Sequence, residues 1–251
     1  MYNCKSMEKY NENMKEFNPS YSQHNIKLFM NHLLVGKPGS GKTNQVLNII
    51  ERCQGCFSKI QIYTPNNEGE PLYLMMEERL NKQKEGTVIL EDIKNIPYLC
   101  DQPKGQGQQL IIIDDFITQG KKIMTIVEEY AIRGRQQLFT ILFLSQSYYA
   151  TPVKIRATIR YLCLLKITDK RNMDMIISTI ASDIPSGILM KCIKNAVKFK
   201  MNVAVIDLQA DDNNKIVRRN YGVDEYYIVE DENEEPIQNP KLFLTSGIKN
   251  D

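Results

Sequence analysis

Four residues between positions 36 and 43 have types and spacing suited to holding a chain of phosphates. Gly36, Gly41, Lys42 and Thr43 fit the pattern G-x-x-x-x-G-K-[ST]. Glycines let the backbone turn where a residue with a Cβ would be strained, so successive N–H groups can point inward and form an anion-binding nest. The lysine can reach the β- and γ-phosphates, and the threonine hydroxyl can bind Mg²⁺. The motif therefore predicts a site for ATP with Mg²⁺ as its metal.

The residues around this motif agree with that interpretation. Bulky apolar residues precede Gly36 and an amphipathic pattern follows Lys42, which is the strand–loop–helix context that the motif requires. The positive end of such a helix would add to the field at the phosphates. The alternative is an ordinary glycine-rich turn. We expect nucleotide contacts from the whole loop: Gly36, Lys37, Pro38, Gly39, Ser40, Gly41, Lys42, Thr43 and Asn44.

A second candidate group is a pair of carboxylates in QLIIIDDF, the segment Gln109–Phe116. Asp114 would stand at the end of a buried strand and hold Mg²⁺ through water. Asp115 would follow it and orient or deprotonate the attacking water. Two adjacent carboxylates at such a position are costly unless a cation or hydrogen-bond donors face them. The alternative is an exposed Asp-Asp turn.

A third polar group ends the apolar run LFTILFLSQSYY. Gln146 would stand at the end of the strand that follows the acidic one along the chain. In that context its amide can sense the γ-phosphate or the attacking water. Without it, Gln146 is an ordinary polar residue at a strand end.

The elements that must position these groups alternate along the chain. Several apolar runs are continuous rather than alternating, as in strands buried on both faces of a parallel sheet. Expected strands are Leu28–Val35, Lys59–Tyr63, Thr87–Leu90, Gln109–Asp114, Leu138–Ser145, Tyr161–Ile167 and Met201–Asp207. Expected helices are Thr43–Cys53, Pro71–Lys82, Lys121–Arg133, Pro152–Arg160 and Asp169–Ala181. This alternation predicts an α/β fold with crossover connections.

Composition sets wider limits. The 251 residues are 42% hydrophobic and 25% charged, and no apolar run reaches the roughly 18 residues of a membrane span. The polar start has no apolar signal core, which argues against secretion. A net charge of +2 leaves a nucleic-acid partner open, provided that the contact surface is a local patch. Cys53 and Cys56 form a CxxC without a second pair, so we interpret them as a helix end followed by a turn at Gly55.

We divide the chain into three parts. Residues 1–25 are expected to be a polar arm, residues 26–208 a nucleotide-binding domain, and residues 209–251 a C-terminal extension. The extension contains an acidic tail, EDENEEP, from Glu230.

Three segments together carry a family resemblance: GKPGSGKT, IIIDDF and AIRGRQQLFTILFLSQSYYATPVKIRATIRYLCLL. They resemble the genome-packaging ATPases of large DNA viruses and virophages, the poxvirus type included, within the FtsK–HerA superfamily of ring-forming motors. The resemblance covers about residues 28–207 and is most specific from Ser145 to Leu162. It implies a P-loop NTPase of the additional-strand (RecA-like, ASCE) class, with a central, mostly parallel sheet flanked by helices. The strand of Gln146 would lie between those of Lys42 and Asp114.

The resemblance also implies a function. Such a protein would hydrolyse ATP in a homo-oligomeric ring, a pentamer or hexamer, and pump double-stranded DNA into a capsid. Its partners would be the DNA and a capsid or portal-vertex protein. It would work in the host cytoplasm at the viral factory, with the virion as a second location.

Motors of this kind complete a neighbour's site with an arginine, and family position favours Arg156, followed by Arg135, with Arg133 and Arg160 as further candidates. Two departures from the pattern stand out. Asp115 replaces the glutamate of bacterial and archaeal relatives, although the viral branch resembles this chain. Ala157 and Thr158 stand where many relatives have an asparagine.

Contacts with DNA need only cations that grip phosphates. Tyr148 and Tyr149 lie near the first cluster of such cations, and the alternative for a charge run is a solvated face. The candidates are Lys154, Arg156, Arg160, Lys166, Lys170, Arg171, Arg218 and Arg219. Two other functions stay open: a nucleoside or nucleotide kinase, and a nucleotide-gated assembly switch.

Overall fold

The structure is a computed structural model that describes residues 17–83, 87–103, 107–166, 169–180, 185–210, 215–223 and 225–227, without the side chains of residues 80–83. Most of the expected N-terminal arm and the expected acidic tail from Glu230 lie outside the described residues.

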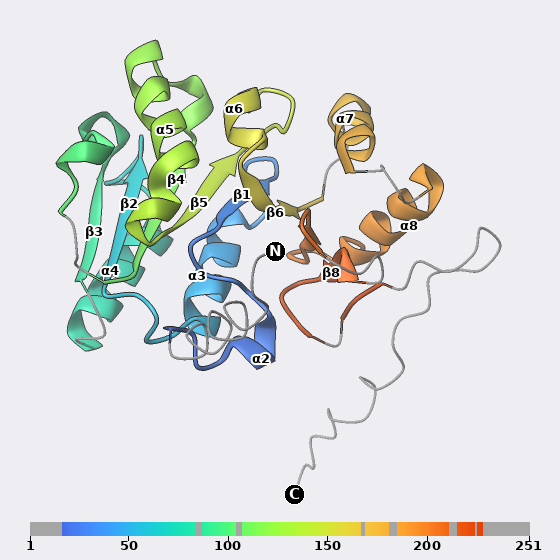
Figure 1. The fold of residues 1–251 in the computed structure, drawn as a ribbon, viewed down its shortest axis with the longest axis horizontal. Helices are drawn as coiled ribbons and strands as arrows, with labels where there is room; N and C mark the ends of the chain where they lie inside the picture. Colours follow the sequence, from blue (N-terminus) through green and yellow to red (C-terminus); the bar gives the residue numbers. More distant parts are fainter. Residues whose placement is uncertain are drawn as a thin grey trace, which may run out of the picture.

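The described strands form one eight-stranded sheet in the order β3-β2-β4-β5-β1-β6-β7-β8 (Figure 1). Strands β1 to β6 run parallel, and β7 and β8 are added antiparallel. The strands are β1 (Asn31–Val35), β2 (Lys59–Thr64), β3 (Thr87–Asp92), β4 (Gln109–Asp114), β5 (Phe139–Ser145), β6 (Ile159–Leu164), β7 (Ala204–Asp207) and β8 (Val217–Arg219). Because β5 lies between β1 and β4, the predicted additional-strand order is confirmed.

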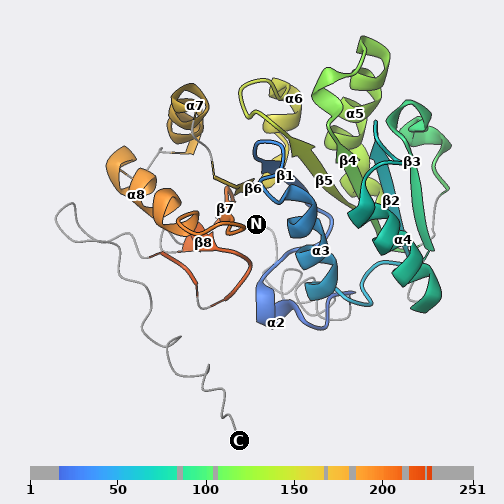
Figure 2. The same cartoon turned by 180° about the vertical axis from the view of Figure 1, so that it is seen from behind.

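Helices cover both faces of this sheet. The described helices are α2 (Tyr21–His24), α3 (Lys42–Arg52), α4 (Pro71–Gln83), α5 (Lys121–Arg133), α6 (Val153–Arg156), α7 (Lys170–Ile180) and α8 (Ser186–Ala196). Helix α5 lies in front of the sheet in Figure 1, and α3 and α4 lie in front in the opposite view of Figure 2. Helices α3 and α4 pack in one apolar core, and α5 to α8 pack in the other. Alternate residues of the strands serve the two cores, which is why the runs read as continuously apolar.

Several predicted boundaries were wrong. The expected helix Pro152–Arg160 is a single turn, α6, because the chain extends into β6 at Ile159, which pairs with Asn31 of β1. The next strand ends at Leu164 rather than at Ile167. Helix α8 and strand β8 were not expected at all, and β8 extends the sheet beyond the predicted domain boundary at residue 208.

Other expectations agree with the structure. Helix α3 ends at Arg52, and Gly55 follows with φ of 76°, so the CxxC does mark a helix end and a turn. Among the described helices, none has the length and apolar character that crossing a membrane requires.

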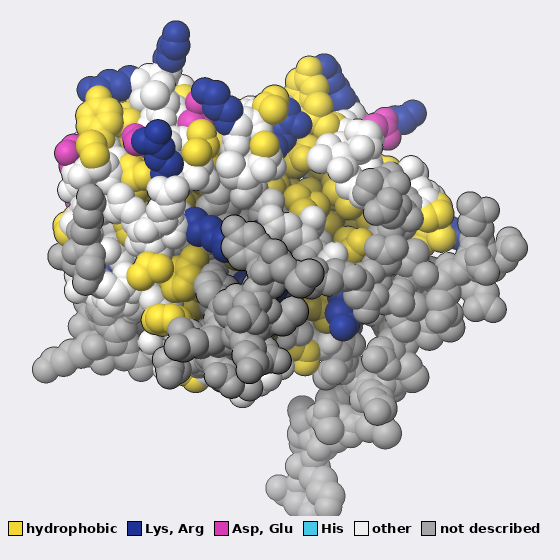
Figure 3. Space-filling view, in the orientation of Figure 1, with side chains coloured by type: hydrophobic (Ala, Val, Ile, Leu, Met, Phe, Trp, Pro, Cys, Tyr) yellow, Lys and Arg dark blue, Asp and Glu magenta, His cyan; other side chains and the backbone are white. Residues whose placement is uncertain are grey.

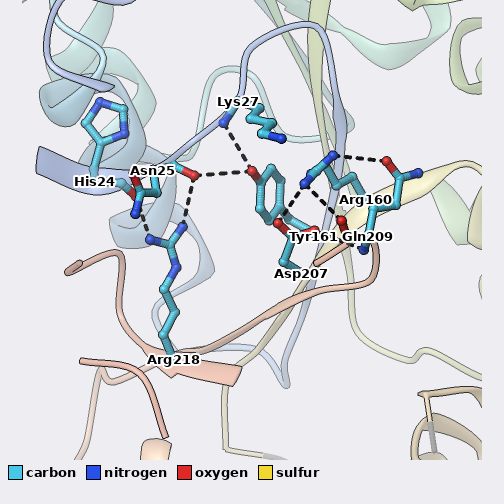
Figure 4. Close-up of polar contacts among 8 residues, drawn as sticks. All are labelled: His24, Asn25, Lys27, Arg160, Tyr161, Asp207, Gln209 and Arg218. Atoms are coloured by element: carbon cyan, nitrogen blue, oxygen red, sulfur yellow. Dashed lines mark hydrogen bonds and ion pairs between the residues drawn. The ribbon is translucent and has the colours of Figure 1, made fainter. Parts of the chain in front are cut away.

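Residues before β1 are bonded to side chains of β6 and β8 (Figure 4). Arg218 of β8 is 2% exposed, and its Nη1 donates to the carbonyl of His24 at 2.6 Å. The Tyr161 hydroxyl of β6 accepts from the backbone N–H of Lys27 at 3.1 Å and donates to the carbonyl of Asn25 at 3.3 Å. These bonds lie at the end of β1 opposite the glycine-rich loop.

Two of the arginines proposed to contact DNA are therefore used inside the subunit. Arg160 is 7% exposed and forms an ion pair with Asp207, with 2.9 Å between Nη2 and Oδ2. Arg218 is occupied as described. Arg219 also has a partner, because its Nε lies 2.8 Å from Glu225 Oε2. The expectation for Arg160 and Arg218 was wrong because sequence alone does not separate buried from exposed cations.

Removal of the Arg218 guanidinium should destabilise the fold without touching the loop at the other end of β1. In Arg218→Met the buried carbonyl of His24 loses its donor, which costs about 1–3 kcal/mol. We expect a loss of that size in the free energy of unfolding measured with urea. Arg219→Met, which removes a more exposed ion pair, is the control and should lose less. Equal losses in the two variants would contradict the structural role of Arg218.

Candidate active site

The loop between β1 and α3 is tied to the neighbouring strand. The N–H of Gly36 donates to the carbonyl of Ser145, at the end of β5, over 3.1 Å. A Cβ at Gly36 would lie 2.4 Å from the Ser40 hydroxyl oxygen and 3.0 Å from the Leu165 Cβ, so a larger residue would have to displace the Ser40 side chain. Gly41 has φ of 98°, a left-handed conformation that glycine adopts readily. The two glycines thus have the steric roles expected from the motif.

The loop holds polar groups that an anion would satisfy. The Lys42 ammonium donates to the carbonyls of Gly36 (2.9 Å) and Lys37 (3.4 Å). Burial lowers the pKa of Lys42, and the neighbouring Asp114 and Asp115 act against that shift. The Ser40 hydroxyl is buried without a hydrogen-bond partner within the described residues. A phosphate oxygen in the loop would give both residues an acceptor, so the loop fits a polyphosphate.

The two carboxylates lie in different surroundings. Asp114 Oδ2 accepts a hydrogen bond from the Tyr73 hydroxyl at 3.0 Å. Burial raises the pKa of Asp114, against the lowering effects of the Tyr73 bond and the Lys42 charge. Asp115 has φ of 45°, a left-handed conformation that is costly for a residue other than glycine and is often found at functional sites. Its Oδ1 accepts from the Gln146 side-chain amide at 3.0 Å, so the structure brings together two residues that the sequence analysis proposed separately.

These groups line a single cleft at the carboxyl ends of β1, β2, β4 and β5. Its volume of about 580 Å³ is in the range of small-molecule sites. Lys42 and Lys200 are the cations among the described lining residues, and Glu70, Asp114 and Asp115 are the carboxylates. The remaining lining residues are Pro38, Gly39, Gly41, Thr43, Asn44, Thr64, Pro65, Asn66, Leu72, Gln146 and Met201.

The oxygen ligands in this cleft suit a hard cation. Thr43 offers a hydroxyl and Asp114 a carboxylate, the donor types that Mg²⁺ prefers. Among the described residues there is no group of three or more His, Cys, Asp or Glu that could hold a metal. A cation here would have few protein ligands, which fits Mg²⁺, because Mg²⁺ is commonly bound by one or two carboxylates together with substrate phosphates.

The proposed arginines lie outside this cleft. Arg156 donates from Nε to the carbonyl of Thr151 at 2.9 Å, and its guanidinium carbon lies 5.1 Å from the centre of the Tyr148 ring. Arg133 forms an ion pair with Glu129 at 3.6 Å. Arg135 is exposed in the turn that follows α5.

Sequence reasoning missed Tyr73 and seven residues that line the cleft: Thr64, Pro65, Asn66, Glu70, Leu72, Lys200 and Met201. Tyr73 is near the start of α4 and is fully buried against Asp114. Met201, with φ of 72°, lies before β7, and its carbonyl accepts from the Gln45 side chain of α3 at 2.7 Å. That bond holds the turn containing Lys200 beside the loop. No motif marks these positions; the segment EPLYLMM, with a proline at the first helical position, signals only that a helix starts there.

The order of β4, β5 and β1, with polar groups at their ends, defines a P-loop NTPase of the additional-strand class. The chain belongs to the family described as Poxvirus A32 protein, whose sequence profile matches residues 15–233. No curated protein sequence gives a significant match to the chain.

Solved structures of viral packaging enzymes have the same fold. One is B204, the DNA-packaging ATPase of Sulfolobus turreted icosahedral virus, with a TM-score of 0.53 and 13% identity over 79% of this chain and 100% of that one. Another is the genome-packaging NTPase B204 of Sulfolobus turreted icosahedral virus 2 in complex with AMPPCP, with a TM-score of 0.54 and 15% identity over 78% and 98% of the two chains. The same enzyme in complex with ATP-γS gives a TM-score of 0.51 and 14% identity over 77% of this chain and 98% of that one. At this identity the likeness establishes the fold; family and fold together support a nucleotide-binding, DNA-packaging ATPase.

The Asp114 carboxylate should cost the empty protein stability at neutral pH. Its pKa in the fold is raised above the ordinary value of 3.8. As the pH rises, the carboxyl therefore ionises first in the unfolded chain, and the free energy of unfolding falls. We expect the nucleotide-free Asp114→Asn protein to melt at a higher temperature than the wild type at pH 7. This difference should shrink as the pH falls from the raised pKa of the folded carboxyl toward the ordinary value of 3.8, and it should be absent at lower pH. Asp174→Asn, on the exposed side of α7, is the control and should change little at either pH. A loss of stability in Asp114→Asn at pH 7 would contradict this account.

Proposed function

We propose that this protein is an ATP-hydrolysing ring motor that moves double-stranded DNA into a viral capsid. One observation carries the proposal: the Asp115–Gln146 pair, bonded at 3.0 Å, faces the same cleft as Lys42 and Thr43 of the phosphate loop. A carboxylate and an amide held together at this position suit the activation of a water molecule. Membership of the Poxvirus A32 protein family supports the DNA-packaging role.

Each residue of the site then has a part in hydrolysis. Backbone N–H groups of the loop from Lys37 to Asn44, among which Pro38 has none, bind the phosphates, and the Lys42 ammonium leaves the Gly36 carbonyl for a phosphate oxygen. Thr43 and, through water, Asp114 would hold Mg²⁺, and the ion would supply positive charge to the phosphates. Asp115 accepts the proton of the attacking water, and the Gln146 amide orients that water and detects the γ-phosphate.

An arginine from a neighbouring subunit would complete the site. Such a residue increases the rate of phosphoryl transfer by about 10³–10⁵-fold. We retain Arg156 as the proposed residue, with Arg135 second. In one subunit Arg156 is bound to the carbonyl of Thr151, and Arg135 is exposed. The absence of any arginine from the described lining of the cleft is consistent with a group supplied in trans by a pentamer or hexamer.

Exposed cations near the carboxyl ends of the strands are the proposed DNA contacts. In Figure 3, Lys and Arg side chains gather along the upper edge, over α5, α6 and α7. Lys154, Lys166, Lys170 and Arg171 are all exposed, and the Arg171 guanidinium carbon lies 3.8 Å from the centre of the Tyr149 ring. Contacts of this kind grip phosphates without reading sequence, which is what a translocating motor needs.

The setting follows from the packaging role. The motor would work in the host cytoplasm, at the viral factory, and would dock on a capsid or portal-vertex protein, with the virion as a second location. A kinase fits the cleft less well, because Gln146 and Asp115 favour water over a nucleoside acceptor. A nucleotide-gated assembly switch would share the site but would turn over slowly and ignore DNA.

The decisive measurement is the ATPase rate of the oligomer with and without double-stranded DNA. We expect DNA to stimulate hydrolysis, with no phosphate transferred to nucleosides. Lys42→Ala should reduce the rate by at least about 100-fold, since it removes a charge from the transferring phosphates. Asp115→Asn should still bind ATP but hydrolyse it at a similarly reduced rate.

If Asp115→Asn hydrolysed ATP at the wild-type rate, the assignment of Asp115 as the general base would be wrong. Slow turnover by wild-type protein that is already oligomeric, with no response to DNA, would favour the switch.

Lys200, which lines the cleft beside the glycine-rich loop, should strengthen ATP binding. Its turn is held to α3 by the bond from Gln45 to the Met201 carbonyl. Lys200→Ala should weaken ATP binding about 3- to 10-fold, as expected for an exposed charge contact of roughly 1 kcal/mol. Lys198→Ala is the matched control, because Lys198 is exposed on the same turn and does not line the cleft. Equal affinities in the two variants, measured by fluorescence titration, would exclude the contact.

A further inference from the structure

Among the described hydrogen bonds, the Tyr73 hydroxyl is the only tyrosine hydroxyl that donates to a carboxylate of the nucleotide cleft. It donates to Asp114 Oδ2 at 3.0 Å, and the side chain has no exposed surface. The Thr43 hydroxyl lies near the same phenol. A single buried side chain therefore donates to one of the residues proposed to hold Mg²⁺ and lies near the other.

The local sequence explains how Tyr73 reaches this position. Helix α4 begins at Pro71, and the N–H of Tyr73 donates to the Glu70 carbonyl at 3.1 Å, so Tyr73 lies in the first turn. Its ring packs in the same apolar core as Val46, Ile62 and Ile112, from α3, β2 and β4. Full burial in this core restricts the ring and with it the position of the hydroxyl.

A carboxylate whose orientation is fixed by a hydrogen bond binds a metal more tightly than one that can rotate freely. Asp114 accepts the hydrogen bond from Tyr73 through Oδ2, and its carboxylate lines the cleft. Side chains that orient metal ligands in this way typically change metal affinity 10- to 100-fold when they are removed.

We propose that Tyr73 is a positioning residue that presets Asp114 and Thr43 for Mg²⁺ and thereby ties α4 to the metal. This inference rests on the proposed function, because it assumes the Mg²⁺ site described there. It assigns Tyr73 no contact with the nucleotide or the metal itself. The segment before α4 shares in the arrangement, since Asn66, Glu70 and Leu72 line the same cleft.

The test compares Tyr73→Phe with Tyr63→Phe. Tyr63 is a good control because it is 2% exposed, lies on β2 before the same segment, and donates its hydroxyl to Gln61 Oε1 at 2.8 Å rather than to Asp114. Both changes remove one buried hydroxyl. A fluorescent non-hydrolysable ATP analogue is titrated onto each variant in EDTA and at a series of Mg²⁺ concentrations, and unfolding of the nucleotide-free proteins is followed in urea.

We expect Tyr73→Phe to raise the Mg²⁺ concentration for half-maximal effect by about 10-fold and to change the affinity in EDTA less than twofold. Tyr63→Phe should alter neither. The inference is overturned if the two variants need the same Mg²⁺ concentration, or if Tyr73→Phe loses as much affinity in EDTA as in Mg²⁺. It is also overturned if Tyr73→Phe fails to fold while Tyr63→Phe folds, because the hydroxyl would then have a purely structural role.

The wild-type titration separates this inference from the proposed function. Analogue binding that does not depend on Mg²⁺ in the wild type would contradict the metal site itself, and the inference with it. Mg²⁺-dependent binding in the wild type, unchanged in Tyr73→Phe, would contradict the role of Tyr73 alone.

Discussion

The position of β5 between β1 and β4 is the constraint on which the site depends. All three strands are parallel, so their carboxyl ends meet at one edge of the sheet. The loop at Gly36, the carboxylates after Ile113 and the amide of Gln146 are far apart in the sequence, and only this strand order makes them neighbours. The bond from the Gly36 N–H to the Ser145 carbonyl then fixes the height of the loop against β5.

The two apolar cores make this edge rigid enough to hold costly groups. Asp114 and Lys42 are both partly withdrawn from water. Burial raises the pKa of Asp114 and lowers that of Lys42, so it favours the neutral form of each. Such positions are unfavourable for an empty protein. They persist because strands buried on both faces leave the side chains little freedom to move toward solvent. The cost of holding these groups is offset by apolar burial elsewhere in the sheet. This is the usual relation between a stable scaffold and a strained site.

Much of this site could be predicted from sequence, because each chemical group follows an apolar run that identifies its strand. Lys42, Thr43, Asp114, Asp115 and Gln146 were found in that way and lie in one cleft. Their individual roles stay predictions. Tyr73 and Lys200 could not be found, because they reach the cleft through tertiary packing from segments that carry no motif. Arg160 and Arg218 were proposed as surface cations but are buried. A run of charged residues does not indicate which of its members face the interior.

The bonds from the Lys42 ammonium to the carbonyls of Gly36 and Lys37 have a consequence for exchange of nucleotide. The Lys42 side chain is bonded within its own loop, so a phosphate oxygen that binds this ammonium takes the place of a carbonyl partner. Arrival and departure of nucleotide are then exchanges between two sets of hydrogen bonds, and the ammonium has acceptors in both. A cycle built on such exchanges can reset after each turnover without unfolding the loop.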